Sequence, residues 1–138
     1  MRHLVKEAGL ENEFEIDSAG TAGWHIGKRP DSRMTRAAEN RGIPMKGSAR
    51  QVEPDDFNRF DWIFAMDDSN YEDLIDVRDS CPNPTARLIR FCELCEEHEE
   101  KEVPDPYYGG PEGFEKVLDL LEDGCAAFLQ RWEKKDLP

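Results

Sequence analysis

The sequence has far fewer basic than acidic residues and no long apolar run. Its 18 Lys and Arg stand against 31 Asp and Glu, which gives a formal net charge of −13 at pH 7. We therefore expect no nucleic-acid partner, because such partners require a basic protein surface. The longest apolar run covers only residues 62–66, which is far too short to cross a bilayer. No basic-then-apolar leader opens the chain, so we expect no membrane partner, no export and a cytoplasmic location.

The four cysteines of the chain do not form a recognisable metal or disulfide pattern. They are Cys81, Cys92, Cys95 and Cys125, and without export we expect reduced thiols. The Cys92-x-x-Cys95 spacing would suit a redox or metal pair, but a zinc site needs two further ligands, and His98 is the only histidine nearby. We therefore expect structural thiols, no metal and no other cofactor.

Helical and strand patterns alternate along the chain. Helical patterns cover residues 1–8, about 31–41, the stretch after Asp67 or Asp68, and 111–132, and strand patterns cover 13–17, 62–66 and 88–91. This alternation predicts one α/β domain over residues 1–138, with a parallel sheet and helices on both faces. The uninterrupted apolar run at 62–66 is typical of a strand that is buried on both faces.

Two polar loops follow predicted strands. Residues 17–21 and 66–70 each come directly after a strand pattern. Ligands of parallel sheets bind beyond the carboxyl ends of the strands. We therefore expect the polar side chains of these two loops to converge on one rim.

Several short segments of the chain resemble a known family. They occur in the following order: Asp17-Ser18-Ala19-Gly20-Thr21, Trp24, Arg41-Gly42-Ile43, Ala49-Arg50-Gln51, Phe64-Ala65-Met66-Asp67-Asp68-Ser69-Asn70 and Asp105-Pro106-Tyr107-Tyr108-Gly109. Together they resemble the low-molecular-weight protein tyrosine phosphatases over essentially the whole chain, and the last segment is the most specific. The resemblance implies a four-stranded parallel sheet between helices. It also implies metal-independent hydrolysis of phosphotyrosine or, in some bacterial relatives, of phosphoarginine.

The resemblance implies covalent catalysis. In that family a cysteine thiolate attacks phosphorus, while backbone N–H groups and an arginine hold the phosphate oxygens. An aspartic acid protonates the departing phenolate oxygen and then activates the water that releases phosphate. By resemblance, Asp105 is this acid, and the substrate is a phosphotyrosine-containing protein.

The same resemblance assigns binding roles to polar and aromatic residues. Trp24, Tyr107 and Tyr108 match the aromatic walls that flank the substrate ring. Ser18 and Asn70 match polar residues that brace the phosphate loop from below.

The chain departs from the family pattern at its start. The family's first strand, its Cys-x5-Arg-Ser/Thr loop and the start of its first helix would precede Met1, and residues 1–5 match the middle of that helix. The resemblance therefore predicts an N-terminally truncated domain that lacks an inner strand and the catalytic loop. The chain as given is predicted to be inactive.

The loss of an inner strand would have physical consequences. Four buried aliphatic side chains contribute roughly 6–12 kcal/mol, which is comparable with a typical total stability of about 5–15 kcal/mol. The strand edges left behind would invite self-association. Three outcomes are open: the gap closes, another segment fills it, or the sequence omits part of the working protein.

One segment fits Cys-x5-Arg but is not expected to be catalytic. It runs from Cys81 to Arg87 and contains Pro82 and Pro84, which have no N–H group for a phosphate. It has no glycine, Leu88 stands where a hydroxyl should follow, and the segment leads into a strand rather than a helix.

Two alternatives to a tyrosine phosphatase remain open. The chain could be a non-catalytic remnant that acts through protein contacts. It could also be a phosphoarginine phosphatase or an arsenate-reductase-like relative, and in the latter Cys92 and Cys95 would serve as redox thiols. The tyrosine pair Tyr107-Tyr108 favours an aryl phosphate substrate.

Overall fold

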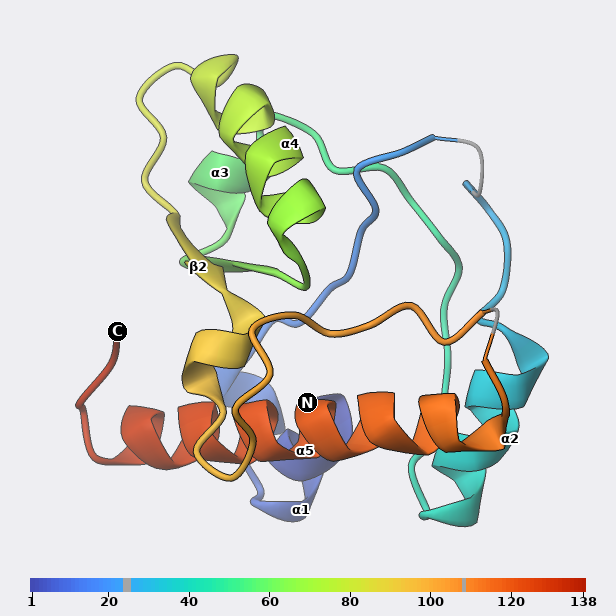
Figure 1. Ribbon diagram of the computed structural model, residues 1–138. Coiled ribbons are helices and arrows are strands. Elements are labelled where there is room, and N and C mark those ends of the chain that lie inside the picture. Colours follow the sequence, from blue (N-terminus) through green and yellow to red (C-terminus); the bar gives the residue numbers. More distant parts are fainter. Residues whose placement is uncertain (24–25, 108) are drawn as a thin grey trace.

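The computed structural model describes residues 1–23, 26–107 and 109–138. Its helices and strands follow one another as shown in Figure 1. They are α1 (Arg2–Glu7), the 3-10 helix η1 (Glu11–Glu13), α2 (Ser32–Asn40), α3 (Asp56–Arg59), β1 (Trp62–Ala65), α4 (Asp68–Asp79), β2 (Arg87–Arg90), the 3-10 helix η2 (Phe91–Leu94) and α5 (Pro111–Glu133). The predicted helices are all present, each within a few residues of its expected bounds.

The sheet consists of β1 and β2, which run parallel. Trp62 lies opposite Arg87, and Ala65 lies opposite Arg90. The connection between the two strands contains α4, as a parallel crossover requires. The α/β fold with a parallel sheet is therefore confirmed.

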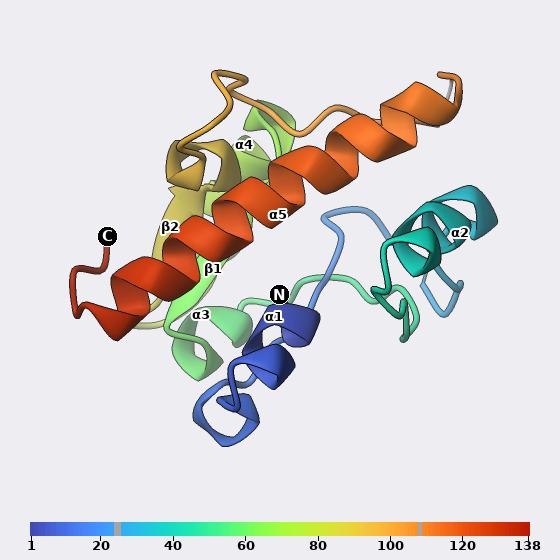
Figure 2. The ribbon, with the colours of Figure 1, turned by 90° about the horizontal axis from the view of Figure 1, so that it is seen from below.

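Helices cover both faces of this sheet because successive side chains of β1 point to opposite sides. On one face Trp62 and Phe64 pack against Phe128 of α5, with ring centroids 5.5 and 5.3 Å apart. On the other face Ala65 and Ile63 pack with Leu74 of α4. Figure 2 shows α5 crossing in front of the sheet, and Figure 1 shows α3 and α4 on the side of the strands opposite to α5. The uninterrupted apolar run in β1 thus serves two cores.

The ends of α2 follow from its flanking residues. The Asp31 carboxylate accepts a hydrogen bond from the Arg33 N–H at 2.8 Å and caps the helix. Gly42 has φ +76° just beyond the helix end, a conformation that glycine adopts without strain. Ala37 and Ala38 then pack against Phe114 of α5.

The predicted strand at residues 13–17 is wrong. Glu13 ends η1, and residues 14–19 form no helix and pair with no strand in the described part of the chain. An alternating sequence becomes a strand only when a ladder partner lies beside it. The nearest ordered pairing is an isolated parallel bridge between Gly20 and Gln51.

Two smaller expectations also need correction. Phe91 opens η2 instead of ending β2, because pairing with β1 stops at Arg90. Trp62, Ile63 and Phe64 are only half-buried, so β1 is not fully enclosed as its composition predicts. The four-stranded sheet that the resemblance implies is represented by two strands among the described residues.

Within the described ranges, we find no helix with both the length and the hydrophobicity needed to cross a membrane.

Candidate active site

Three segments meet beyond the carboxyl end of β1. Met66 follows the strand, and its carbonyl accepts a hydrogen bond from the Val103 N–H at 2.8 Å. Asp67 caps α4 by accepting from the Asn70 N–H at 2.7 Å. Gly20 donates to the Arg50 carbonyl at 2.8 Å and so ties the 17–21 loop to the same region. The rim predicted from the sequence is therefore present.

A cavity of about 420 Å³, here called the slot, lies between residues 15–21 and β1. The residues that line the slot include three with polar side chains, Ser18, Thr21 and Asn70. The Asn70 amide donates to the Thr21 hydroxyl at 3.5 Å. The structure thus brings Ser18 and Asn70 to one cavity, as the sequence predicts, while their role beneath a phosphate stays a prediction.

Asp105 lies on the neighbouring loop that Val103 attaches to β1. Its side chain is exposed, and Oδ1 accepts a hydrogen bond from the Tyr107 N–H at 3.0 Å. This is the local turn that aspartate favours before proline. Asp105 and Tyr107 are not among the residues that line the slot. The structure therefore places the predicted acid near the rim but outside the cavity that Ser18 and Asn70 share.

Arg33 holds the loop of Asp105 against α2 and α5. Its guanidinium donates to the Tyr107 carbonyl at 3.2 Å. It also lies 5.3 Å from the Tyr107 ring centroid and 4.8 Å from that of Phe114. The Asp31 carboxylate accepts two further bonds from the same side chain. Sequence reasoning missed Arg33, whose position in a helical pattern carries no sign of this contact.

Two predicted binding residues, Trp24 and Tyr108, lie outside the described residues. Their place beside a substrate ring remains a prediction.

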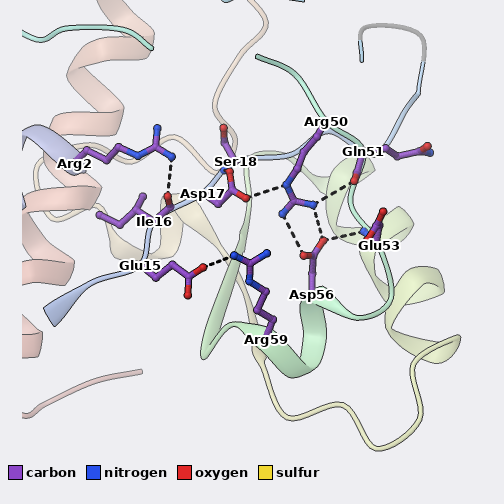
Figure 3. A network of polar contacts seen from close by, with 10 residues as sticks. All are labelled: Arg2, Glu15, Ile16, Asp17, Ser18, Arg50, Gln51, Glu53, Asp56 and Arg59. Carbon is purple, nitrogen blue, oxygen red and sulfur yellow. Dashed lines mark hydrogen bonds and ion pairs between the residues drawn. The ribbon is translucent and has the colours of Figure 1, made fainter. Parts of the chain in front are cut away.

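A network of charged side chains holds the wall formed by residues 15–18 (Figure 3). Arg50 pairs with Asp17 at 3.0 Å and with Asp56 at 3.0 Å, and Asp56 also accepts from the Glu53 N–H at 2.8 Å. Arg59 pairs with Glu15, farther along the same wall. The Asp56 side chain is only 8% exposed, so its charge depends on these partners.

The same network shifts two pKa values. The Asp56 carboxylate raises the pKa of Arg50 against the opposing effect of burial, and Asp17 adds to the rise. Burial alone would raise the pKa of Asp17, but the Ser18 N–H and the Arg50 guanidinium outweigh it, so the pKa falls below 3.8. Asp17 and Arg50 lie in segments that resemble the family, but the sequence offered no reason to assign them a role. The sequence also offered no sign of the role of Asp56, because nothing in the local sequence distinguishes it from Asp55.

The cysteine pair is poorly suited to thiol chemistry. Burial raises the pKa of Cys92, and nearby carboxylates raise it further. Burial and then the Asp123 carboxylate raise the pKa of Cys95 to about 12. A thiolate is the nucleophilic form of cysteine. The two thiols therefore lack the property that an arsenate-reductase-like role requires.

The remaining two cysteines do not supply a nucleophile beside Asp105. Cys125 lines the slot, but burial raises the pKa of its thiol. Cys81 is buried, and its sulfur accepts from the Asn58 amide at 3.2 Å. The loop of Cys81 precedes β2, whereas Val103 joins β1 at Met66, so Cys81 and Asp105 belong to opposite ends of the parallel strands. This supports the dismissal of the Cys81–Arg87 segment as a phosphate loop.

The arrangement is similar to that of known phosphatases. The model of the family "Low molecular weight phosphotyrosine protein phosphatase" matches residues 1–137. The protein of that name from Schizosaccharomyces pombe is 41% identical over 130 residues, which is 94% of this chain and 82% of the relative.

Solved structures agree with this match. A protein tyrosine phosphatase from Entamoeba histolytica with Hepes in its active site has a TM-score of 0.91 at 37% identity, and the match covers 99% of this chain and 86% of that one. The Drosophila arginine phosphatase DARP has a TM-score of 0.88 at 31% identity, covering 95% and 84%. The chain therefore belongs to the low molecular weight phosphotyrosine protein phosphatase family.

Proposed function

We propose that this protein hydrolyses phosphotyrosine monoesters in protein substrates, through a cysteinyl-phosphate intermediate and with Asp105 as the general acid. The observation that carries the proposal is the attachment of the Asp105 loop to the carboxyl end of β1 through the 2.8 Å bond from Val103 to Met66. A proton donor at this edge lies where parallel sheets hold their ligands. A protonated carboxyl group there can deliver its proton to the phenolate oxygen as the P–O bond breaks, and the same group can later accept a proton from water.

The polar and aromatic residues have supporting roles in this proposal. Ser18 and Asn70, which share the slot, brace the phosphate-holding loop. Tyr107, which is 57% exposed, contacts the substrate ring together with Trp24 and Tyr108. Aromatic pairs of this kind contribute about 0.5–1.5 kcal/mol each beyond buried area.

The nucleophile is the component that these 138 residues do not supply. Two segments of the sequence fit Cys-x5-Arg, and neither forms a phosphate loop. The segment from Cys81 to Arg87 has two prolines, which cannot donate N–H groups to phosphate. The segment from Cys125 to Arg131 lies inside α5, where the backbone N–H groups bond within the helix. We propose that catalysis requires a strand and a Cys-x5-Arg-Ser loop from outside these residues. The 138-residue chain by itself is then inactive.

A pair of proteins tests the proposal. One is the 138-residue chain with its intact mass verified. The other is a chimera in which the first strand, cysteine loop and helix start of the S. pombe relative precede Met1. We expect no turnover of p-nitrophenyl phosphate by the first protein, and saturable turnover of p-nitrophenyl phosphate and of a phosphotyrosine peptide by the second.

Substitution of the acid makes the test specific. In the chimera, Asp105→Asn should lower kcat for the phosphotyrosine peptide about 100-fold or more. The loss should be smaller for p-nitrophenyl phosphate, because p-nitrophenolate departs more readily without a proton. Asp73→Asn, which makes the same charge change on an exposed position of α4, is the control and should leave kcat unchanged. Turnover by the 138-residue chain that Asp105→Asn abolishes would refute the proposed need for an external nucleophile.

A phosphoarginine phosphatase is the second candidate, because the Drosophila arginine phosphatase matches this fold with a TM-score of 0.88. Parallel assays of the chimera with phosphoarginine and phosphotyrosine peptides separate the two activities by their kcat/KM ratio. A chimera that folds but hydrolyses neither substrate would instead favour a non-catalytic protein that acts through protein contacts.

Several broader properties are part of the same proposal. We propose a single domain in the cytoplasm that acts on protein substrates and binds neither nucleic acid nor membrane. The net charge of −13 supports the absence of nucleic-acid binding. Self-association through a strand edge is also proposed, and sedimentation velocity over a hundredfold concentration range would test it.

A further inference from the structure

Arg33 joins the N-terminal end of α2 to the loop that carries Asp105. Its Nε and Nη2 groups donate to the two oxygens of the Asp31 carboxylate at 3.2 and 3.0 Å. This paired contact uses one side of the planar guanidinium, and Nη1 on the other side donates to the Tyr107 carbonyl at 3.2 Å. Asp31 therefore sets the direction in which Arg33 reaches the loop.

Two packed helices support the Arg33 side chain. The Asp31 carboxylate also accepts from the Arg33 N–H at 2.8 Å, so one group both caps α2 and orients the guanidinium. The guanidinium lies 4.8 Å from the ring centroid of Phe114, which is 4% exposed and belongs to the core cluster shared by α2 and α5. Arg33 thus has fixed contacts beneath it, although its own side chain is 46% exposed.

Arg33 contacts Tyr107 at two points. The bond to the carbonyl holds the backbone on one side of the Tyr107 Cα, and the guanidinium lies 5.3 Å from the centroid of the Tyr107 ring. On the other side of that Cα, the Tyr107 N–H donates to Asp105 Oδ1 at 3.0 Å. A continuous series of contacts therefore runs from α2 through Tyr107 to the Asp105 carboxyl group.

The bond from Tyr107 also determines which oxygen of Asp105 carries a proton. Oδ1 accepts the Tyr107 N–H, so the proton of the carboxylic acid resides on Oδ2. The Asp105 side chain is exposed, and without this bond nothing local would select one of its rotamers. A general acid must lie within hydrogen-bond reach of the atom that it protonates. Holding Tyr107 in place therefore sets the direction of the proton donor.

We propose that Arg33, oriented by Asp31, is a positioning residue for the general acid: it holds Tyr107 so that the proton on Asp105 Oδ2 is directed at the departing phenolate oxygen. This inference rests on the proposed function, and it gives Arg33 no contact with the substrate. The guanidinium already bonds to Asp31 and Tyr107 and lies against the Phe114 ring. These contacts argue against a second role as the arginine that holds the phosphate oxygens.

Amide exchange in the 138-residue protein tests the positioning without any substrate. Arg33→Met removes the donor groups and keeps an apolar stem against Phe114. Arg36→Met is the matched control, because Arg36 is exposed on the same helix and its side chain makes no ion pair or hydrogen bond within the described ranges. We expect Arg33→Met to speed solvent exchange of the Tyr107 amide at least about fivefold, as measured by NMR, and Arg36→Met to leave it unchanged. Unchanged exchange in Arg33→Met would overturn the inference.

A second variant keeps the test decisive if Arg33→Met does not fold, which circular dichroism checks. Asp31→Asn retains Arg33 and a residue type that caps helices well, but it removes the carboxylate that orients the guanidinium. It should therefore speed exchange of the Tyr107 amide in the same direction as Arg33→Met. Exchange at the rate of the parent protein in Asp31→Asn would overturn the role given to Asp31.

The dependence on the leaving group tests the catalytic consequence in the chimera. Phenyl phosphate and p-nitrophenyl phosphate have rings of the same kind, but phenolate needs a proton to depart more than p-nitrophenolate does. We expect Arg33→Met to lower kcat/KM about tenfold for phenyl phosphate and no more than about threefold for p-nitrophenyl phosphate. A loss of the same size for both substrates would indicate a general structural role and would overturn the inference.

An Asp105→Asn background shows whether Arg33 acts through the acid. There the effect of Arg33→Met on phenyl phosphate should shrink to less than about twofold, because no carboxylic acid remains to be positioned. An undiminished effect would show that Arg33 acts on the substrate directly and would overturn the positioning role.

The two kinds of readout separate this inference from the proposed function. A chimera that folds but hydrolyses no phosphate ester refutes the proposed function, and exchange of the Tyr107 amide then decides by itself whether Arg33 orients Asp105. Normal turnover by an Arg33→Met chimera refutes the role of Arg33 and leaves the proposed function intact.

Discussion

The Arg50 pairs provide a quantitative test of how the wall of the slot is held. Arg50→Met removes the guanidinium but keeps an apolar stem of similar length. Asp56, with a side chain only 8% exposed, then loses hydrogen bonds of 3.0 and 3.2 Å. Asp17 loses one bond of 3.0 Å.

The expected cost follows from what remains around Asp56. Removal of one partner from a buried ion pair costs about 3–5 kcal/mol, because the other charge stays buried without compensation. Asp56 keeps the 2.8 Å bond from the Glu53 N–H, and the Arg50 side chain is 33% exposed. We therefore expect Arg50→Met to lower the free energy of unfolding by about 2–3 kcal/mol. This is a large share of a typical total of about 5–15 kcal/mol.

Urea unfolding at pH 7, followed by far-ultraviolet circular dichroism, measures this change. The midpoint should fall by about 1–2 M urea if the slope is near 1.5 kcal/mol/M. Arg59→Met is the matched control, because it removes the same charge from a pair whose side chains are 59% and 61% exposed. We expect the control to cost no more than about 1 kcal/mol.

A double-mutant cycle identifies the cause of the loss. In an Asp56→Asn background, Arg50→Met no longer leaves a buried charge without a partner. The loss of unfolding free energy that Arg50→Met causes should therefore be smaller by at least about 1 kcal/mol. Equal costs for Arg50→Met and Arg59→Met, or strict additivity in the cycle, would refute the reasoning that Asp56 is a buried charge held by Arg50.

Three further predictions concern other parts of the chain. Gly124→Ala should lower the thermal midpoint, because the new Cβ would lie 2.5 Å from the Phe91 ring and overpacking of this kind costs about 1–3 kcal/mol. Gly113→Ala is the control: its Cβ meets no atom closer than 3.4 Å, so the thermal midpoint should not fall. The pKa of Asp17 is lowered in the folded state, so the ionised carboxylate stabilises the fold fully above the unfolded value near 3.8, and this stabilisation is lost as pH falls through the folded value. Asp17→Asn should therefore reduce the decrease of the urea midpoint with falling pH below about pH 4. An unchanged dependence of the midpoint on pH would contradict this. The Cys95 pKa of about 12 leaves roughly one thiol in ten thousand ionised at pH 8, so iodoacetamide should label Cys95 far more slowly in the native protein than in urea, as read by mass spectrometry.

Local sequence was a good guide where one segment decides its own structure. The cap at Asp31, the positive-φ Gly42 and the long apolar repeat of α5 are all local features, and α2 and α5 form as they predict. The apolar run at residues 62–66 also correctly predicted the strand β1, since a strand between two helical layers needs apolar residues on both faces.

The strand predicted at residues 13–17 shows where local reasoning fails. Its alternation suits a strand, but Phe14 and its successors find no ladder partner in the described part of the chain. Pairing is a property of two segments, so one segment cannot determine it. The same limit applies to Phe64, whose exposure depends on whether anything occupies the slot beside it.

The sequence by itself determined the family, the helices α1, α2, α4 and α5, and the parallel arrangement of the strands. These properties depend on local propensity, hydrophobic period and short motifs, which are written within a few residues of each position. Tertiary structure alone decided that Arg50 joins Asp17 to Asp56, that Arg33 holds the Asp105 loop, and that a slot remains beside β1. Each of these depends on contacts between residues far apart in the chain, whose distances are set only when the whole chain packs.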